Sequence, residues 1–159
     1  MLPAFSGQPI RVELRRPLGP HLAASSMKRR VILLDPAVLD GRGEFERILI
    51  HEIFHFAWLR LGNRARRDWE QLLCREIRAR ARGELGWSAE WRKTKLRESD
   101  IAGRSPAWRR YICESFCDTA AWRFAGLRRH AEFTLPRRFC GARRRWFDAA
   151  FSPSRTIPL

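Results

Sequence analysis

The chain has 159 residues, a formal net charge of +15 and 45% hydrophobic residues. This length suits one domain with a real hydrophobic core, so we expect a single domain over residues 1–159. No apolar run is long enough to cross a membrane, and residues 1–9 show no charged segment followed by an apolar one. We therefore expect a cytoplasmic protein without membrane contact.

Arginine supplies almost all of the positive charge, with 29 Arg against three Lys. This skew is typical of coding in a GC-rich genome, because arginine codons are GC-rich and lysine codons are not. Whatever its origin, the charge favours acidic partners at low salt. We therefore keep proximity to nucleic acid as one hypothesis and a solvated basic surface as the other.

The first third of the chain predicts three short strands. Residues 1–9 contain two prolines and predict an irregular leader. Residues 10–15 alternate apolar and polar side chains, which is typical of a half-buried strand, and residues 21–26 predict a second, weaker strand. Residues 30–34 end in an unbroken apolar run, which predicts a strand buried on both faces.

The remainder of the chain predicts helices, which makes the fold class α+β. We expect a small domain in which a short antiparallel or mixed sheet packs on one central helix and a mostly helical half follows. The aperiodic residues 152–159 predict an irregular tail. The expected helices cover residues 44–61, 64–82, 88–96, 106–125 and 136–151.

The central helix carries the pentapeptide His51-Glu52-Ile53-Phe54-His55, which has the pattern H-E-x-x-H. Residues four apart lie on one face of a helix, so both imidazoles can bind one Zn²⁺. Glu52 is then placed to act as a general base on a water at the metal. The alternative is a buried helix with two core histidines.

A catalytic zinc site usually has three protein ligands, and Glu114 is our candidate for the third. It lies in an apolar-rich helix, and Asp118 follows four residues later on the same face. Two buried carboxylates repel each other unless a cation lies near them. Asp118 can accept the free ring N–H of a ligand histidine. The alternatives are a surface carboxylate pair, or ligation by His130, Cys113 or Cys117.

With these residues in place, the sequence resembles the gluzincin zinc metallopeptidases, in particular the small minigluzincins and the ImmA/IrrE-like peptidases. In that family a later helix supplies the third ligand in an E-x-x-x-D pattern, which Glu114 and Asp118 match. The resemblance covers roughly residues 20–62 and 106–126. The 58 residues between His55 and Glu114 form a longer spacer than in the compact relatives, which predicts an insertion.

The resemblance implies a small zincin-like domain and a zinc metalloendopeptidase that acts on a peptide or protein substrate, with Glu52 as the general base. It also implies a donor for the developing oxyanion. The candidates are Tyr111, one turn before Glu114, and less strongly His21 or His130. The substrate would add as a strand to the sheet edge formed by residues 21–26.

Three further expectations concern regulation and alternatives. The tail at residues 152–159 could fill the cleft, as in latent minigluzincins, or be a disordered end. The protein could be a regulatory protease acting on DNA-bound repressors, as the ImmA/IrrE-like resemblance implies. It could also be a non-catalytic zinc-binding module with the same fold.

Overall fold

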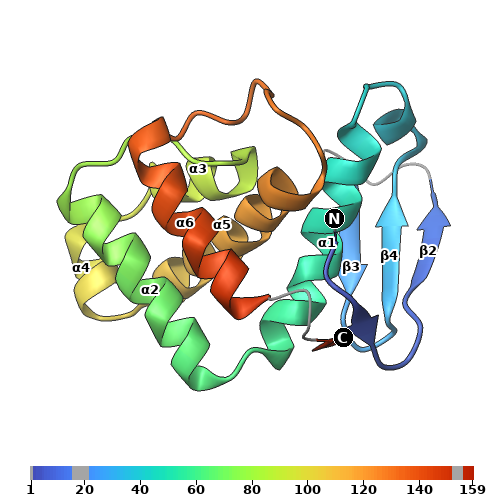
Figure 1. Cartoon of the computed structure of the whole chain (residues 1–159), viewed down its shortest axis with the longest axis horizontal. Coiled ribbons are helices and arrows are strands. Elements are labelled where there is room, and N and C mark those ends of the chain that lie inside the picture. Colours follow the sequence, from blue (N-terminus) through green and yellow to red (C-terminus); the bar gives the residue numbers. More distant parts are fainter. Residues whose placement is uncertain (1, 16–21, 152–155) are drawn as a thin grey trace.

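A computed structural model describes residues 2–15, 22–151 and 156–159 of the chain. A three-stranded mixed sheet contains β2 (Arg11–Leu14), β3 (Ala23–Ser26) and β4 (Val31–Leu34). The strand order is β2-β4-β3, with β4 parallel to β2 and antiparallel to β3 (Figure 1). The predicted α+β class with a small mixed sheet is thus confirmed.

The central strand β4 and the two outer strands differ in how far they are buried. In β4, Ile32 and Leu34 are fully buried, as the apolar run predicted. All four residues of β2 are exposed, so the predicted half-burial of this strand is wrong. Figure 1 shows the reason: β2 is the strand farthest from the helices, and no helix covers it. The opposite edge strand, β3, lies beside the central helix.

The helices follow the predicted ranges to within a few residues. Two helical elements were not predicted, because they are too short for a periodic pattern: a 3₁₀ turn, η1 (Pro36–Leu39), and α4 (Glu98–Ala102). Asp35 begins η1 by accepting a hydrogen bond from the Ala37 N–H at 2.9 Å. The other helices are α1 (Glu44–Arg60), α2 (Asn63–Arg78), α3 (Trp87–Lys93), α5 (Pro106–Phe124) and α6 (Arg137–Ala150).

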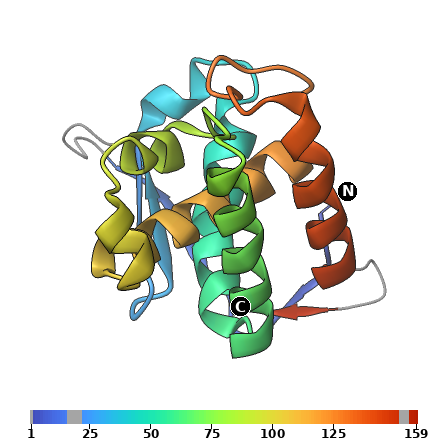
Figure 2. The same cartoon turned by 90° about the vertical axis from the view of Figure 1, so that its left-hand side faces the viewer.

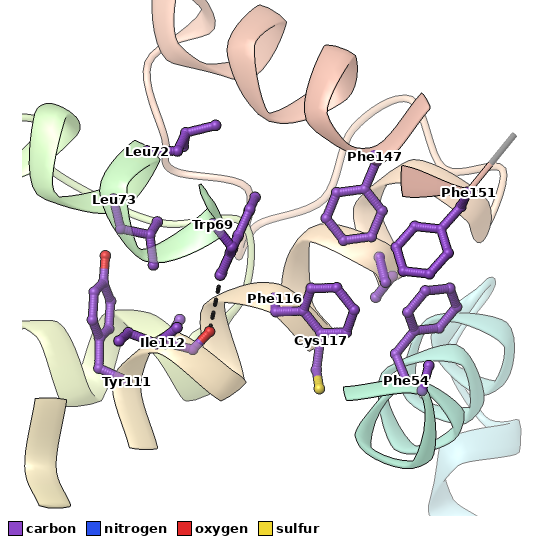
Figure 3. Close-up of a cluster of buried hydrophobic side chains, with 14 of the residues drawn as sticks. Phe54, Trp69, Leu72, Leu73, Tyr111, Ile112, Phe116, Cys117, Phe147 and Phe151 are labelled. Atoms are coloured by element: carbon purple, nitrogen blue, oxygen red, sulfur yellow. Dashed lines mark hydrogen bonds between the residues drawn. The ribbon is translucent and has the colours of Figure 1, made fainter. Parts of the chain in front are cut away.

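Helix α1 lies between the sheet and the other helices (Figures 1 and 2). One side of α1 packs on β3, β4 and η1, and the other packs on α5. Phe54 is fully buried and contacts the rings of Phe116 and Phe151, with centroids 5.8 and 5.5 Å apart (Figure 3). Because both sides of α1 are covered, the H-E-x-x-H segment is held in a rigid part of the fold.

A buried ionic network joins α2, the connection after it, and α6. The guanidinium of Arg143 is fully buried and lies 2.7 Å from both Glu76 and Glu84. Lys93 lies 3.0 Å from Glu84, and Tyr111 donates a hydrogen bond to the same carboxylate at 2.6 Å. Its members tie α2, α3, α5 and α6 together around the Glu84 carboxylate.

The two chain ends meet in a short parallel ladder of β1 (Phe5–Ser6) and β5 (Ile157–Pro158). The expectation of an irregular leader and tail is therefore wrong at these residues. Burial explains the difference: Ile157 is only 6% exposed, and the ring centroids of Phe5 and Phe54 lie 6.0 Å apart. In the described ranges no helix combines the length and apolar character needed to cross a membrane.

Candidate metal site

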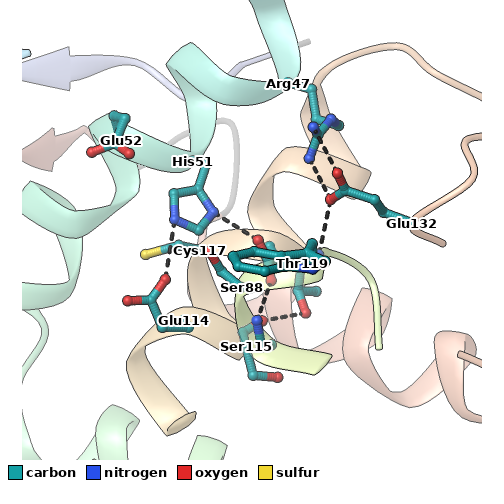
Figure 4. Close-up of polar contacts among 12 residues, drawn as sticks. Arg47, His51, Glu52, Ser88, Glu114, Ser115, Cys117, Thr119 and Glu132 are labelled. Carbon is teal, nitrogen blue, oxygen red and sulfur yellow. Dashed lines mark hydrogen bonds and ion pairs between the residues drawn. The ribbon is translucent and has the colours of Figure 1, made fainter. Parts of the chain in front are cut away.

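Helices α1 and α5 bring two histidines and a glutamate together. The Nε2 atoms of His51 and His55 lie 3.2 Å apart. Glu114 Oε2 lies 3.3 Å from the first of these nitrogens and 3.9 Å from the second (Figure 4). Ligand atoms at 2.0–2.1 Å from a tetrahedral ion are roughly 3.3–3.4 Å apart, so these three donors have nearly the spacing of one tetrahedral face.

Asp118 fixes the orientation of the first histidine. Its Oδ1 lies 2.7 Å from His51 Nδ1, and its Oδ2 accepts a hydrogen bond from the Ala89 N–H at 2.8 Å. Burial alone would lower the pKa of His51, but the nearby Asp118 carboxylate holds it well above 6.5. A proton on Nδ1 leaves Nε2 of His51 directed at His55 and Glu114.

Glu114 is placed among cations. Burial would raise its pKa, but the hydrogen bond and charge of His51 lower it to about 2. Its second oxygen, Oε1, lies 3.1 Å from the Arg92 guanidinium. The carboxylate is therefore ionised at neutral pH, which is the form that binds a metal.

Two thiols lie on the far side of His55. Its Nδ1 is 3.5 Å from Cys113 Sγ and 3.4 Å from Cys117 Sγ. His51, His55 and Cys117, one of the alternative ligands named above, each offer an atom within 4.8 Å of the others, a group that could hold a metal ion. The site thus contains two overlapping sets of donors.

Glu52 lies beside the histidines but points elsewhere (Figure 4). It is 8% exposed and accepts a hydrogen bond from the Ser25 hydroxyl, across the gap between α1 and β3. The role of Ser25 was missed in the sequence, since nothing near position 25 has a motif. The contact depends on β3 running antiparallel to β4 beside α1.

The cleft consists of two adjoining hollows of about 290 and 410 Å³. Both are lined by His51, Glu52 and Ser88, so these residues lie where the hollows meet. Helix α3, which belongs to the long spacer, forms a wall of the cleft. Beyond the shared residues, Met27, Trp58, Leu59 and Arg92 line the larger hollow, and Leu22, Ile48, Trp87 and the ion pair Arg47–Glu132 line the smaller one.

Of the candidate oxyanion donors, the two that the structure describes do not line the cleft. Tyr111 is fully buried, and its hydroxyl donates a hydrogen bond to Glu84, so the predicted catalytic role of Tyr111 is wrong. Burial places this side chain in the core, because it faces Trp108 and the ionic network. His130 pairs with Glu44 and lines neither hollow of the cleft. His21 lies outside the described residues.

Comparisons of the chain with protein-family models, curated proteins and solved structures find no match. The interpretation of the site therefore depends on its own geometry and chemistry.

Proposed function

We propose that the protein is a zinc-dependent metallopeptidase in which His51, His55 and Glu114 hold the metal. The observation that carries this proposal is the convergence of their three donor atoms, at separations of 3.2, 3.3 and 3.9 Å. Two imidazoles and one carboxylate form a donor set typical of catalytic zinc, which keeps a fourth position open. Such a site suits hydrolysis better than a purely structural role.

The geometry favours Glu114 over Cys117 as the third ligand. Nε2 of His55 faces His51 and Glu114, whereas Nδ1 of His55 faces the sulfur atoms. When both histidines bind through Nε2, each Nδ1 remains free for a hydrogen bond: one to Asp118 and the other to a cysteine. This arrangement gives both ligands a supporting partner.

A zinc ion held by His51, His55 and Glu114 would supply a Lewis acid for the peptide carbonyl and for a water molecule, whose pKa it would lower. Glu52 accepts a proton from the attacking water and later delivers it to the leaving amine. The hydrogen bond from Ser25 holds the Glu52 carboxylate at the junction of the two hollows. With Tyr111 buried, no tyrosine takes part, because it is the single tyrosine of the chain.

The proposed substrate is an extended peptide that lies along β3. Within the described residues, β3 pairs only with β4, so its other edge is open beside the cleft. A peptide that adds to this edge gains backbone hydrogen bonds and passes Glu52. The larger hollow, with Met27, Trp58 and Leu59, then favours an apolar side chain on one side of the cleaved bond.

The test is the variant Glu52→Gln, assayed on a library of unstructured peptides together with metal analysis. We expect zinc to stay near one ion per chain while cleavage falls by about 10²-fold or more, since a general base contributes 10²–10⁴-fold. The matched control is Glu46→Gln, the same change at an exposed position of α1. Cleavage by Glu52→Gln at the rate of the unchanged protein would contradict the mechanism.

A non-catalytic zinc module is the second candidate, and the proximity of Cys117 to the histidines favours it. A thiolate in addition to His51, His55 and Glu114 would close the coordination shell, as in structural sites. Cobalt substitution separates the two functions, because a thiolate ligand gives an intense sulfur-to-cobalt absorption band. Its presence, with no peptide cleavage, would favour the structural module.

A further inference from the structure

A hollow of about 870 Å³ lies away from the metal cleft and shares none of its lining residues. It lies where the end of α5, the start of α6 and the segment that joins them meet; that segment crosses the top of the molecule in Figure 2. We call it the basic hollow, because it is lined by Arg123, Arg128, Arg129, Arg137 and Arg144. Its volume is in the range of small-molecule sites.

Carboxylates neutralise only part of the positive charge in the basic hollow. Among the described residues no Asp or Glu lines it. Arg123 pairs with Asp148 at 3.0 Å, whereas the other four arginines have no carboxylate within ion-pair distance in the described ranges. Four unpaired guanidiniums around one concave surface favour an anion with several oxygens, such as a di- or triphosphate.

Aromatic rings line the same hollow, beside the apolar side chains of Leu85, Leu127 and Leu135. Arg144 lies over the Trp122 ring, with 5.3 Å from Cζ to the centroid. The Phe133 ring lies 5.3 Å from that of His130, and both side chains line the hollow. A phosphate ion alone would not use these rings, whereas a nucleobase stacks on aromatic and guanidinium planes.

We propose that the basic hollow binds a nucleotide unit, with its phosphates on the arginines and its base against Trp122 or Phe133. The unit is either a free nucleotide or one residue of a single strand, since the two share this chemistry. The inference is independent of the metal site, because none of the metal donors lines this hollow.

The test is isothermal titration calorimetry with ATP, inorganic triphosphate and a short single-stranded oligothymidylate. The variant is Arg137→Ala/Arg144→Ala, in which both side chains are exposed and carry no ion pair in the described structure. We expect its affinity for ATP to fall by about tenfold or more, because the phosphates lose hydrogen bonds from two charged donors. Circular dichroism checks that the variant is folded.

The matched control is Arg67→Ala/Arg75→Ala, which removes the same charge from exposed positions of α2 outside the hollow. This control should bind ATP within about twofold of the unchanged protein, because exposed charges beyond about 10 Å are screened by salt. An equal loss in both double variants would show general attraction of anions and overturn the proposal.

A third variant, Phe133→Leu, tests the base. We expect it to weaken ATP binding more than triphosphate binding, because stacking contributes only when a base is present. Binding of oligothymidylate but not ATP, lost only in Arg137→Ala/Arg144→Ala, would assign the nucleotide to a strand. Triphosphate bound as tightly as ATP, or no binding of any probe to the unchanged protein, would overturn the proposal.

Discussion

His51 and His55 direct their Nε2 atoms at each other across 3.2 Å, one turn apart on α1. Helix geometry places the two rings on one face, but the partners on α5 determine which nitrogen of each ring faces inward. Asp118 contacts Nδ1 of the first ring, and two thiols contact Nδ1 of the second. The inward nitrogens then share Glu114 as a neighbour.

This arrangement predicts that Glu114→Gln weakens zinc binding more than Cys117→Ala does. The first change replaces a carboxylate that would bind the metal directly. We expect zinc affinity to fall by at least about 100-fold, because the loss of a residue that only supports a metal ligand typically lowers metal affinity by about 10–100-fold. The second removes only a contact to His55 Nδ1, and we expect about a tenfold loss. Competition with a zinc chelator at constant pH measures both. The reverse order would identify Cys117 as the ligand.

The close packing of Gly86 against the Asp118 carboxyl group gives a second prediction. A Cβ on Gly86 would lie 2.2 Å from Asp118 Cγ, so Gly86→Ala must displace a carboxylate held by His51 and the Ala89 N–H. We expect zinc affinity to fall by about 10–100-fold, as in Asp118→Asn, which loses the charge opposite His51. Chelator competition again provides the measurement.

The matched control for this prediction is Gly62→Ala, where an added Cβ meets no atom within 4 Å. Zinc affinity should be unchanged in that variant. Full zinc affinity in Gly86→Ala would show that Asp118 does not support His51 in the way we describe.

The lowered pKa of Glu84 predicts how the free energy of unfolding depends on pH. Burial would raise its pKa, but Arg143 first, and then Lys93 and Tyr111, hold it at about 2, below the ordinary 4.5. A lowered carboxyl pKa means that its stabilising contribution is present above pH 4.5 and is lost as the pH falls towards 2. The free energy of unfolding should therefore decrease steeply over that interval.

The variant Glu84→Gln tests this effect by urea unfolding at several pH values. At neutral pH we expect a loss of about 3–5 kcal/mol, because Arg143 keeps a buried charge with one partner fewer. The pH dependence between 4.5 and 2 should become shallower than in the exposed control Glu46→Gln. An unchanged slope would mean that other carboxylates dominate acid unfolding.

Local patterns predicted the helices and the histidine pair, because helical spacing and capping act within a few residues. The E-x-x-x-D pattern also predicted Glu114 and Asp118 as partners of the histidines, and the structure places both beside His51. Other contacts that depend on tertiary packing were not predicted. Ser25 reaches Glu52 only through the antiparallel pairing of β3. Tyr111 lies one turn before Glu114 but faces the buried ionic network. Arg143 belongs to the same network, although the run of arginines in which it lies is typical of a solvated helix face. Site residues that belong to a helical motif, on α1 or on α5, were accessible to sequence reasoning, whereas contacts such as Ser25 with Glu52 were not.

The chain end gives the last prediction. Residues 156–159 line neither hollow of the cleft; instead, Ile157 pairs with Phe5 and is buried beside α1. We therefore expect Ile157→Ala to lower the free energy of unfolding by about 2–4 kcal/mol, as for other large-to-small core changes, while the exposed control Thr156→Ala has little effect. Deletion of residues 156–159 should likewise lower stability without raising the rate of peptide cleavage. A higher cleavage rate after this deletion would support the alternative, in which the tail blocks the cleft.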